Sequence, residues 1–220
     1  MTPCATTGKI KDPSSTGNTM LKTLPNLLTL SRILAVPLLV ATFYLPSRLA
    51  PWIACGIFVV ACITDWLDGH FARRWKQQTE FGRFLDPIAD KLVVAAALFM
   101  LAATQKISAI TILPALVILM REILVSGLRE HLATVRVSLP VSRLAKWKTA
   151  IQMVAIAILL LQGAEQTTIP VETVGEIMLW LAAGLTLVTG WDYLYVGLTH
   201  MDDVTVEPPA PPSAEPGHAA

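Results

Sequence analysis

The sequence predicts an all-α, polytopic integral membrane protein with six transmembrane helices and with its N- and C-termini in the cytosol. Hydrophobic residues make up 54% of the 220-residue chain and charged residues only 15%, whereas an average soluble domain is about 25% charged. Six apolar segments approach the ~20 residues that a bilayer span requires. Basic residues gather on one side of these segments, which orients them in the membrane.

The six segments follow one another through short connectors, and they are too long and too uniformly apolar to be strands. In order along the chain, the predicted helices are residues 27–46, 52–74, 84–104, 107–130, 145–163 and 171–198. The connectors are marked, in the same order, by Pro46 and Pro51, the polar run 73–83, Lys106, Pro140 and the run 163–170. Together these helices form one predicted domain, residues 21–201.

Lysine and arginine are distributed unevenly between the two sides of the predicted helices. With the N-terminus in the cytosol, the outer loops hold Arg48 and Lys106. The cytosolic side then receives Lys9, Lys11, Lys22, Arg73, Arg74, Lys76, Arg83, Arg129, Arg136, Arg143, Lys146 and Lys148. Because cytoplasmic loops carry an excess of basic residues, this asymmetry predicts that both termini are cytosolic.

Two polar tails flank the helical domain. Residues 1–20 lack the apolar stretch of a cleavable signal peptide, and we expect a disordered N-terminal extension. Residues 202–220 are acidic and then rich in proline, which predicts a disordered C-terminal tail. The net charge is only +1, so the chain has little attraction for phosphate backbones and we expect no nucleic-acid partner.

Four aspartates lie inside the second and third apolar segments, where an ionisable side chain is costly and usually functional. Asp65 and Asp68 are near the end of the second helix, and Asp86 and Asp90 are near the start of the third. Spacings of three and four residues place each pair on one helical face. Two divalent cations would offset these carboxylates, and oxygen ligands favour Mg²⁺ or Mn²⁺. Such a two-metal site is typical of phosphoryl transfer.

Two other interpretations of the aspartates remain open. They could be separate acids, protonated or paired with Arg73, Arg83 and Lys91, or they could line a path for protons or metal ions. The surrounding residues favour phosphate chemistry. Gly69 and Ala72 lack bulk on the aspartate face, and Arg73, one turn from Gly69, can meet a phosphate group.

The full stretch is Asp65-x2-Asp68-Gly69-x2-Ala72-Arg73-x8-Gly82-x3-Asp86-x3-Asp90. It resembles the signature of the CDP-alcohol phosphatidyltransferases at every specified position. The resemblance implies an integral, generally dimeric enzyme whose six helices surround a cavity open to the cytosol. Such an enzyme transfers a phosphatidyl or related group from a CDP-linked donor to an alcohol and releases CMP.

The same resemblance implies roles for individual residues. The metal ligands would be Asp65, Asp68, Asp86 and Asp90. Asp90 would also be the general base that takes the proton of the acceptor hydroxyl. The CDP site would include Asp65, Gly69, Ala72, Arg73 and Thr79.

Polar residues on the first helix extend the expected donor site. Asn26, Thr29 and Arg32 recur at a spacing of three and form one polar stripe in an apolar segment. By the resemblance, this stripe lies beside the donor site and contacts CDP-diacylglycerol. Arg121 lies in the apolar run of the fourth helix, and Glu122 is adjacent in sequence and not on its face. The phosphate of a small acceptor would give Arg121 a partner.

Lys146 and Lys148, at the inner end of the fifth helix, complete the expected acceptor site. Together, residues 25–32, 121–130 and 146–149 resemble the corresponding stretches of family members whose acceptor is sn-glycerol 3-phosphate. We therefore expect Arg121, Lys146 and Lys148 to hold the phosphate of this acceptor. The alternatives are a CDP-dependent cardiolipin synthase of the same family and a carboxylate-lined divalent-metal transporter. The resemblance further implies a homodimer in the bacterial inner membrane, with its active site facing the cytosol.

Overall fold

The computed structural model describes residues 24–75, 80–134, 143–164 and 170–204. Within these ranges the chain is helical and contains no strand, which confirms the all-α class for the described part. The helices are α2 (Leu24–Thr42), α3 (Ala50–Trp75), α4 (Glu80–Ala103), the short 3₁₀ helix η2 (Ala109–Thr111), α5 (Ile112–Thr134), α6 (Arg143–Leu160) and α7 (Val171–Val204). The predicted tail 1–20 and most of the predicted tail 202–220 lie outside the described residues.

The helices correspond one to one with the six predicted segments, but their bounds differ. The first ends at Thr42 and not at residue 46. There the N–H of Phe43 donates to the carbonyl of Val40 (3.2 Å), a spacing of three residues that tightens and closes the last turn. The last helix continues to Val204, past the predicted end at residue 198.

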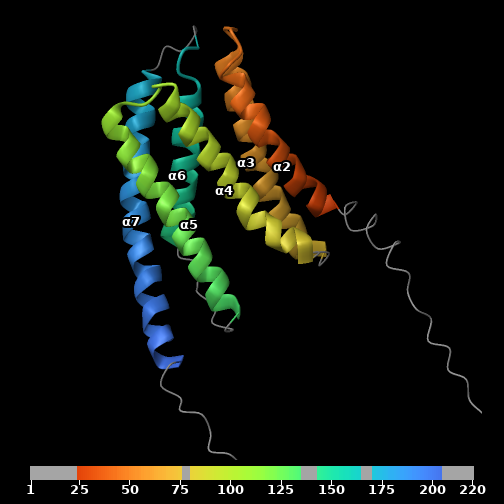
Figure 1. Cartoon of the computed structure of the whole chain (residues 1–220), viewed down its shortest axis with the longest axis vertical. Helices are drawn as coiled ribbons and strands as arrows, with labels where there is room; N and C mark the ends of the chain where they lie inside the picture. Colours follow the sequence, from red (N-terminus) through yellow and green to blue (C-terminus); the bar gives the residue numbers. More distant parts are fainter. Residues whose placement is uncertain (1–23, 76–79, 135–142, 165–169, 205–220) are drawn as a thin grey trace, which may run out of the picture.

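The six α-helices of the described chain form two groups of three. α2 packs mainly against α3 and α4, whereas α7 packs mainly against α5 and α6. Contacts between the two groups are sparser and involve chiefly α3 with α6 and α4 with α5 and α6. Figure 1 shows α2 and α3 on one side of the molecule and α5, α6 and α7 on the other. The space between the groups is therefore where a cavity can form.

Apolar side chains fill the interior of both groups. Phe58 of α3, Ala97 of α4, Ile118 of α5 and Leu179 of α7 are each fully buried in one continuous core. α6 and α7 approach closely at Gly175, where an added Cβ would lie 2.6 Å from Cγ of Leu159. Because lipid tails are as apolar as these side chains, close packing between the helices is what stabilises the contacts within each group.

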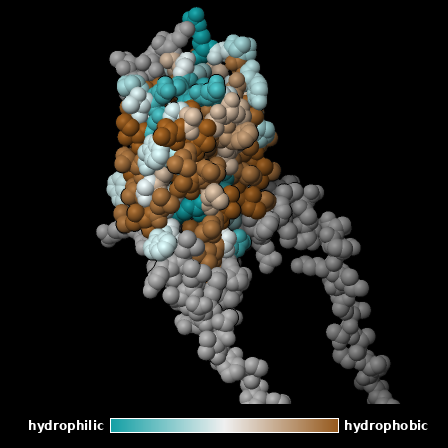
Figure 2. All heavy atoms as spheres, turned by 60° about the vertical axis from the view of Figure 1, so that its left-hand side comes forward, coloured by the Kyte–Doolittle hydropathy of each residue, from teal (hydrophilic) through white to brown (hydrophobic). Residues whose placement is uncertain are grey.

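The outer surface is also apolar, as a membrane protein requires. Large side chains such as Phe99 and Trp191 are about 70% exposed (70% and 72%), and Figure 2 shows hydrophobic residues over much of the described surface. Among the described residues, three helical stretches are long and apolar enough to cross a membrane: Ala50–Leu67, Ala109–Glu130 and Val171–Trp191. A shorter apolar stretch covers Thr29–Thr42.

The six predicted spans are therefore only partly supported. α4 and α6 do not reach the length of a continuous apolar span within the described chain. Charged residues lie in the first half of each of these helices, including Asp90 and Lys91 in α4 and Lys146 and Lys148 in α6. Three of these charged residues, Asp90, Lys146 and Lys148, are also residues that the sequence assigns to a functional site.

The helices begin and end at two opposite ends of the bundle, which we name separately. One end is formed by the first turns of α2, α4 and α6 and the last turns of α3, α5 and α7, and it lies lowermost in Figure 1. We name it the cavity end. The opposite end is formed by the last turns of α2, α4 and α6 and the first turns of α3, α5 and α7, and we name it the loop end.

Polar contacts join the two helix groups at the loop end. The backbone N–H of Ser108 donates to Oε1 of Glu176 on α7 (2.6 Å), and its hydroxyl donates to Oε2 (3.0 Å). Nζ of Lys106 donates to the carbonyl of Gln162 (2.8 Å) and lies 5.3 Å from the ring centroid of Phe43, which directly follows α2. The connector between α4 and η2 is thus fixed to both groups.

Candidate active site

A cavity of about 970 Å³ lies between the helix groups, toward the cavity end. Residues of α3, α4, α5 and α6 line it. Its volume falls in the range of ligand sites, roughly 300–1,000 Å³. The charged residues in its wall are Asp65, Asp90, Lys91, Arg121, Glu122, Arg129, Glu130 and Lys146. A cavity with this many ionisable groups inside an apolar bundle is the strongest candidate for a functional site.

Carboxylates reach this cavity from two helices. Asp65 comes from the second half of α3 and Asp90 from the first half of α4. Asp90 Oδ1 lies 3.2 Å from Nζ of Lys91, which also donates to the carbonyl of Pro87 (3.0 Å). Asp65 accepts a hydrogen bond from Nη1 of Arg32. The two acids therefore share one cavity, and each has a cation beside it.

α2 supports the acidic wall from behind. Arg32 is only 2% exposed, and its guanidinium forms a salt bridge with Asp65. Thr29, one turn earlier on the same helix, is buried to the same extent. Neither residue is among the described residues that line the cavity. Of the predicted polar stripe on α2, Arg32 reaches the site through its salt bridge with Asp65.

Cationic side chains reach the cavity from α5 and α6. Arg121 and Lys146 both line it. Nη2 of Arg121 donates to Oγ1 of Thr189 on α7 (3.2 Å). The arginine stem lies against Gly190, where an added Cβ would be 3.2 Å from Cγ of Arg121. α7 therefore positions Arg121 although it contributes no described residue to the cavity wall.

Lys148 lies beneath the cavity wall. It is 1% exposed, is not among the described lining residues, and forms a salt bridge with Glu122, which does line the cavity. Glu122 Oε2 also lies 4.0 Å from Nη1 of Arg121. Because a buried charge needs a partner, Lys148 and Glu122 stabilise each other between α5 and α6. This carboxylate separates Lys148 from the space that a ligand would occupy.

Residues 22–188 match a protein family described as CDP-alcohol phosphatidyltransferase. The match covers most of the chain, including every helix that lines the cavity. The chain belongs to the CDP-alcohol phosphatidyltransferase family.

Relatives within this family share one name. A Rickettsia bellii protein named CDP-diacylglycerol–glycerol-3-phosphate 3-phosphatidyltransferase is 51% identical over 170 residues, covering 77% of this chain and 92% of the relative. A Cereibacter sphaeroides protein of the same name is 40% identical over 215 residues, covering 82% and 97%. One from Haemophilus influenzae is 43% identical over 175 residues, covering 79% and 92%.

Part of the family signature falls outside the described side chains. The predicted site residues in that category are Asn26, Asp68, Gly69, Ala72, Arg73 and Asp86, and Thr79 lies outside the described residues altogether. Among the described residues, no group of three or more histidine, cysteine or acidic side chains could hold a metal ion. Asp65 and Asp90 nevertheless bring carboxylate oxygens to one cavity, and oxygen is the ligand that Mg²⁺ and Mn²⁺ prefer.

Several polar residues that line the cavity are not among the predicted site residues, and Lys91, Arg129 and Gln152 are examples. The sequence indicates Lys91 only as a possible partner of an acid, and Arg129 as a basic residue of the cytosolic side. Gln152 was not singled out, although it is a polar residue in the apolar segment 145–163. The reasoning that identified the aspartates, that a polar group in an apolar helix needs a reason, would have found Gln152 as well.

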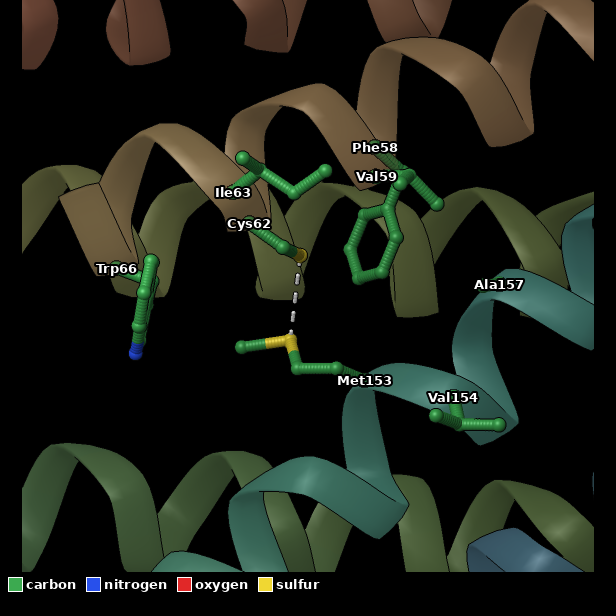
Figure 3. Close-up of a pocket in the computed structure, with 8 residues that line it drawn as sticks. All are labelled: Phe58, Val59, Cys62, Ile63, Trp66, Met153, Val154 and Ala157. Atoms are coloured by element: carbon green, nitrogen blue, oxygen red, sulfur yellow. Dashed lines mark hydrogen bonds between the residues drawn. The ribbon is translucent and has the colours of Figure 1, made fainter.

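An apolar pocket of about 280 Å³ adjoins the polar cavity between α3 and α6. Figure 3 shows Phe58 and Trp66 on α3 facing Met153 on α6. Cys62 Sγ lies 3.5 Å from Sδ of Met153. Cys62, Trp66 and Met153 line both spaces, so an apolar surface continues directly into the charged cavity.

Proposed function

We propose that this protein transfers a phosphatidyl group from CDP-diacylglycerol to sn-glycerol 3-phosphate, giving phosphatidylglycerophosphate and CMP in phospholipid biosynthesis. One observation carries the proposal: Asp65 and Asp90 face the same cavity as Arg121 and Lys146. Acids suit metal-assisted phosphoryl transfer, and cations suit an anionic acceptor. The named relatives, which align over nearly their whole length, support this substrate pair.

Four aspartates would hold two divalent cations, Mg²⁺ or Mn²⁺: Asp65, Asp68, Asp86 and Asp90. Their carboxylate oxygens match the preference of these ions, and the two described members face one cavity. Bound cations would supply positive charge that offsets the charge of the donor pyrophosphate.

Asp90 is the general base in this proposal. It accepts the proton of the acceptor's primary hydroxyl as that oxygen bonds to the phosphorus carrying diacylglycerol. The bond from this phosphorus to the bridging oxygen of the pyrophosphate breaks, and CMP leaves with that oxygen. Lys91, with Nζ 3.2 Å from Oδ1, orients the Asp90 carboxylate before the proton is transferred. No covalent enzyme intermediate is needed, because the acceptor attacks directly.

The donor binds on the side of α2, α3 and α4. The residues assigned to it are Asn26, Thr29, Arg32, Asp65, Gly69, Ala72, Arg73 and Thr79. The buried Arg32 acts there by fixing Asp65, with which it forms a salt bridge. The apolar pocket between α3 and α6 adjoins this region and suits a donor that has acyl chains as well as a charged headgroup.

The acceptor binds on the side of α5 and α6. Arg121 and Lys146 face the cavity and hold the phosphate of glycerol 3-phosphate. Lys148 belongs to the same cationic cluster and acts through Glu122, with which it is paired beneath the wall. In this proposal the acceptor phosphate lies across the cavity from the aspartates.

The protein is proposed to cross the bacterial inner membrane six times, with both termini and the cavity on the cytosolic side, and to act as a homodimer. The order of the helices supports this topology, because the start of α2 and the end of α7 lie at the same end of the bundle (Figure 1). Of the basic residues predicted to face the cytosol, Arg129, Arg143, Lys146 and Lys148 lie in the halves of α5 and α6 nearer that end, as the positive-inside rule requires.

The decisive experiment is a CMP-release assay with purified protein, Mg²⁺ and CDP-diacylglycerol, in which acceptors are supplied one at a time. We expect CMP release with glycerol 3-phosphate. Release with phosphatidylglycerol alone would instead indicate a cardiolipin synthase. Divalent-metal flux into protein-containing liposomes without any lipid substrate, together with no CMP release, would indicate a transporter.

A further inference from the structure

Gln152 of α6 is a buried polar residue in the cavity wall. Its side chain is 1% exposed, and among the described residues its Oε1 has no hydrogen-bond partner. The residue nevertheless lines the cavity. A buried carbonyl oxygen without a donor is unfavourable, and such a group in a native structure needs an explanation.

The directions of the helices place Gln152 in the deepest part of the cavity, which is the part farthest from the cavity end of the bundle. α3 and α5 run toward the cavity end, so Cys62 and Leu119 are their innermost lining residues. α4 and α6 run away from it, so the innermost positions there are near Val94 and Met153. The 3.5 Å contact between Cys62 and Met153 fixes α3 and α6 at the same depth.

Gln152 therefore lies next to the apolar innermost residues of the wall, and the nearest charged lining residue on α5, Arg121, is two positions from Leu119. Asp90 and Lys146 lie about one helical turn or more farther toward the cavity end, and Asp65 lies three residues beyond Cys62 in the same direction. A ligand that fills the cavity would meet Gln152 with the part that reaches deepest.

The chemistry of Oε1 restricts which ligand group can satisfy it. A carbonyl oxygen accepts hydrogen bonds and needs a donor. An ionised phosphate offers only acceptors, and the cavity already provides Arg121 and Lys146 for it. A hydroxyl group can donate to Oε1. The carboxamide is also uncharged, which matches a neutral part of the ligand.

We infer that Gln152 binds the acceptor's middle hydroxyl, the one that does not attack, and so makes the enzyme prefer a glycerol phosphate to a simple alcohol phosphate. This inference rests on the proposed function. It assigns to α6 two separate roles in acceptor binding, with Lys146 contacting the phosphate and Gln152 contacting the hydroxyl.

The test compares two acceptors, sn-glycerol 3-phosphate and 3-hydroxypropyl phosphate, which lacks the middle hydroxyl. CMP release is measured with the wild-type protein and with Gln152→Met, a variant of similar size without the carboxamide. We expect Gln152→Met to lower kcat/KM for glycerol 3-phosphate about tenfold, the worth of one hydrogen bond. With 3-hydroxypropyl phosphate the two proteins should be equal, which also shows that the variant is folded.

Gln162 provides a matched control. Its Oε1 is likewise buried without a described partner, but the residue lies at the loop end and does not line the cavity. Gln162→Met should leave the preference between the two acceptors unchanged.

The inference would be overturned if Gln152→Met lowered kcat/KM equally for both acceptors, or if it lowered kcat/KM for neither. An effect confined to the KM for CDP-diacylglycerol would also contradict it. Failure of the proposed function looks different, because the wild-type protein would then release no CMP with either acceptor.

Discussion

The two ends of the helix bundle use polar side chains in opposite ways. At the loop end, Ser108 and Lys106 contact Glu176, Gln162 and Phe43, and these contacts tie the two helix groups together. At the cavity end, the charged residues surround about 970 Å³ of space. The interface between the helix groups is thus joined by polar contacts at the loop end and contains a cavity toward the cavity end.

This difference assigns stability mainly to the loop end and ligand binding mainly to the cavity end. Polar groups that already have protein partners contribute to stability, whereas groups that face a cavity are available to a ligand. Substitutions at the cavity end should therefore change kinetic constants more than stability, and substitutions at the loop end should do the reverse. The following predictions test this contrast.

Removal of divalent metal should have the largest effect. The carboxylates of Asp65 and Asp90 face one cavity, and without a compensating cation the anionic donor would be repelled. We expect EDTA to abolish CMP release and added Mg²⁺ or Mn²⁺ to restore it. Undiminished activity in excess EDTA would remove metal ions from the proposed mechanism.

Asp90→Asn should lower kcat by about 10³-fold, because general base catalysis contributes roughly 10²–10⁴. The variant keeps the shape of the side chain, so donor binding, measured by equilibrium titration with CDP-diacylglycerol, should largely remain. Glu172→Gln is the matched control, since Glu172 is an exposed acid at the loop end. If Asp90→Asn retained full activity, Asp90 would not be the base.

Arg121→Ala should raise the KM for glycerol 3-phosphate by roughly 10- to 100-fold, the worth of a hydrogen bond to a charged group. The KM for CDP-diacylglycerol should change much less. The measurement is steady-state CMP release with each substrate varied in turn. Equal effects on both constants would show that Arg121 doesn't act specifically on the acceptor.

Gly190→Ala should produce a weaker effect in the same direction. An added Cβ at residue 190 would lie 3.2 Å from Cγ of Arg121 and would displace the arginine stem. We expect the KM for glycerol 3-phosphate to rise severalfold, less than the effect of one full hydrogen bond. Gly184→Ala is the control on the same helix, because nothing lies within 4 Å of its added Cβ. If both variants changed the KM for glycerol 3-phosphate equally, α7 would not position Arg121 for acceptor binding.

The fold was largely predictable because long apolar segments and their charged connectors specify helices directly. The six predicted segments each correspond to one helix of the described chain. Their ends were less predictable, since the closing turn at Thr42 depends on a local backbone hydrogen bond. Three of the six predicted spans are supported by a long apolar stretch in the described residues, whereas charges in the first halves of α4 and α6 shorten the apolar stretches there.

The candidate site was predictable as a set of residues but not as an arrangement. The sequence indicated that Asp65 and Asp90 would meet, and the structure brings both to one cavity. It could not indicate that Arg32 lies behind Asp65, or that Glu122 stands between Lys148 and the cavity. Such pairings depend on how helices distant in sequence are rotated against each other, which helical periodicity alone does not specify.

The loop end should give the smallest change in activity. In Glu176→Ala, the N–H and hydroxyl of Ser108 lose their carboxylate partner, which should lower the free energy of unfolding by about 1–3 kcal/mol. We expect a lower midpoint of thermal denaturation in detergent, with both KM values and kcat unchanged. Glu172→Ala, one turn earlier on α7, should leave the midpoint nearly unchanged because that side chain is exposed. A fall in kcat for Glu176→Ala comparable to that of Asp90→Asn would mean that the two ends are coupled and do not divide stability from catalysis.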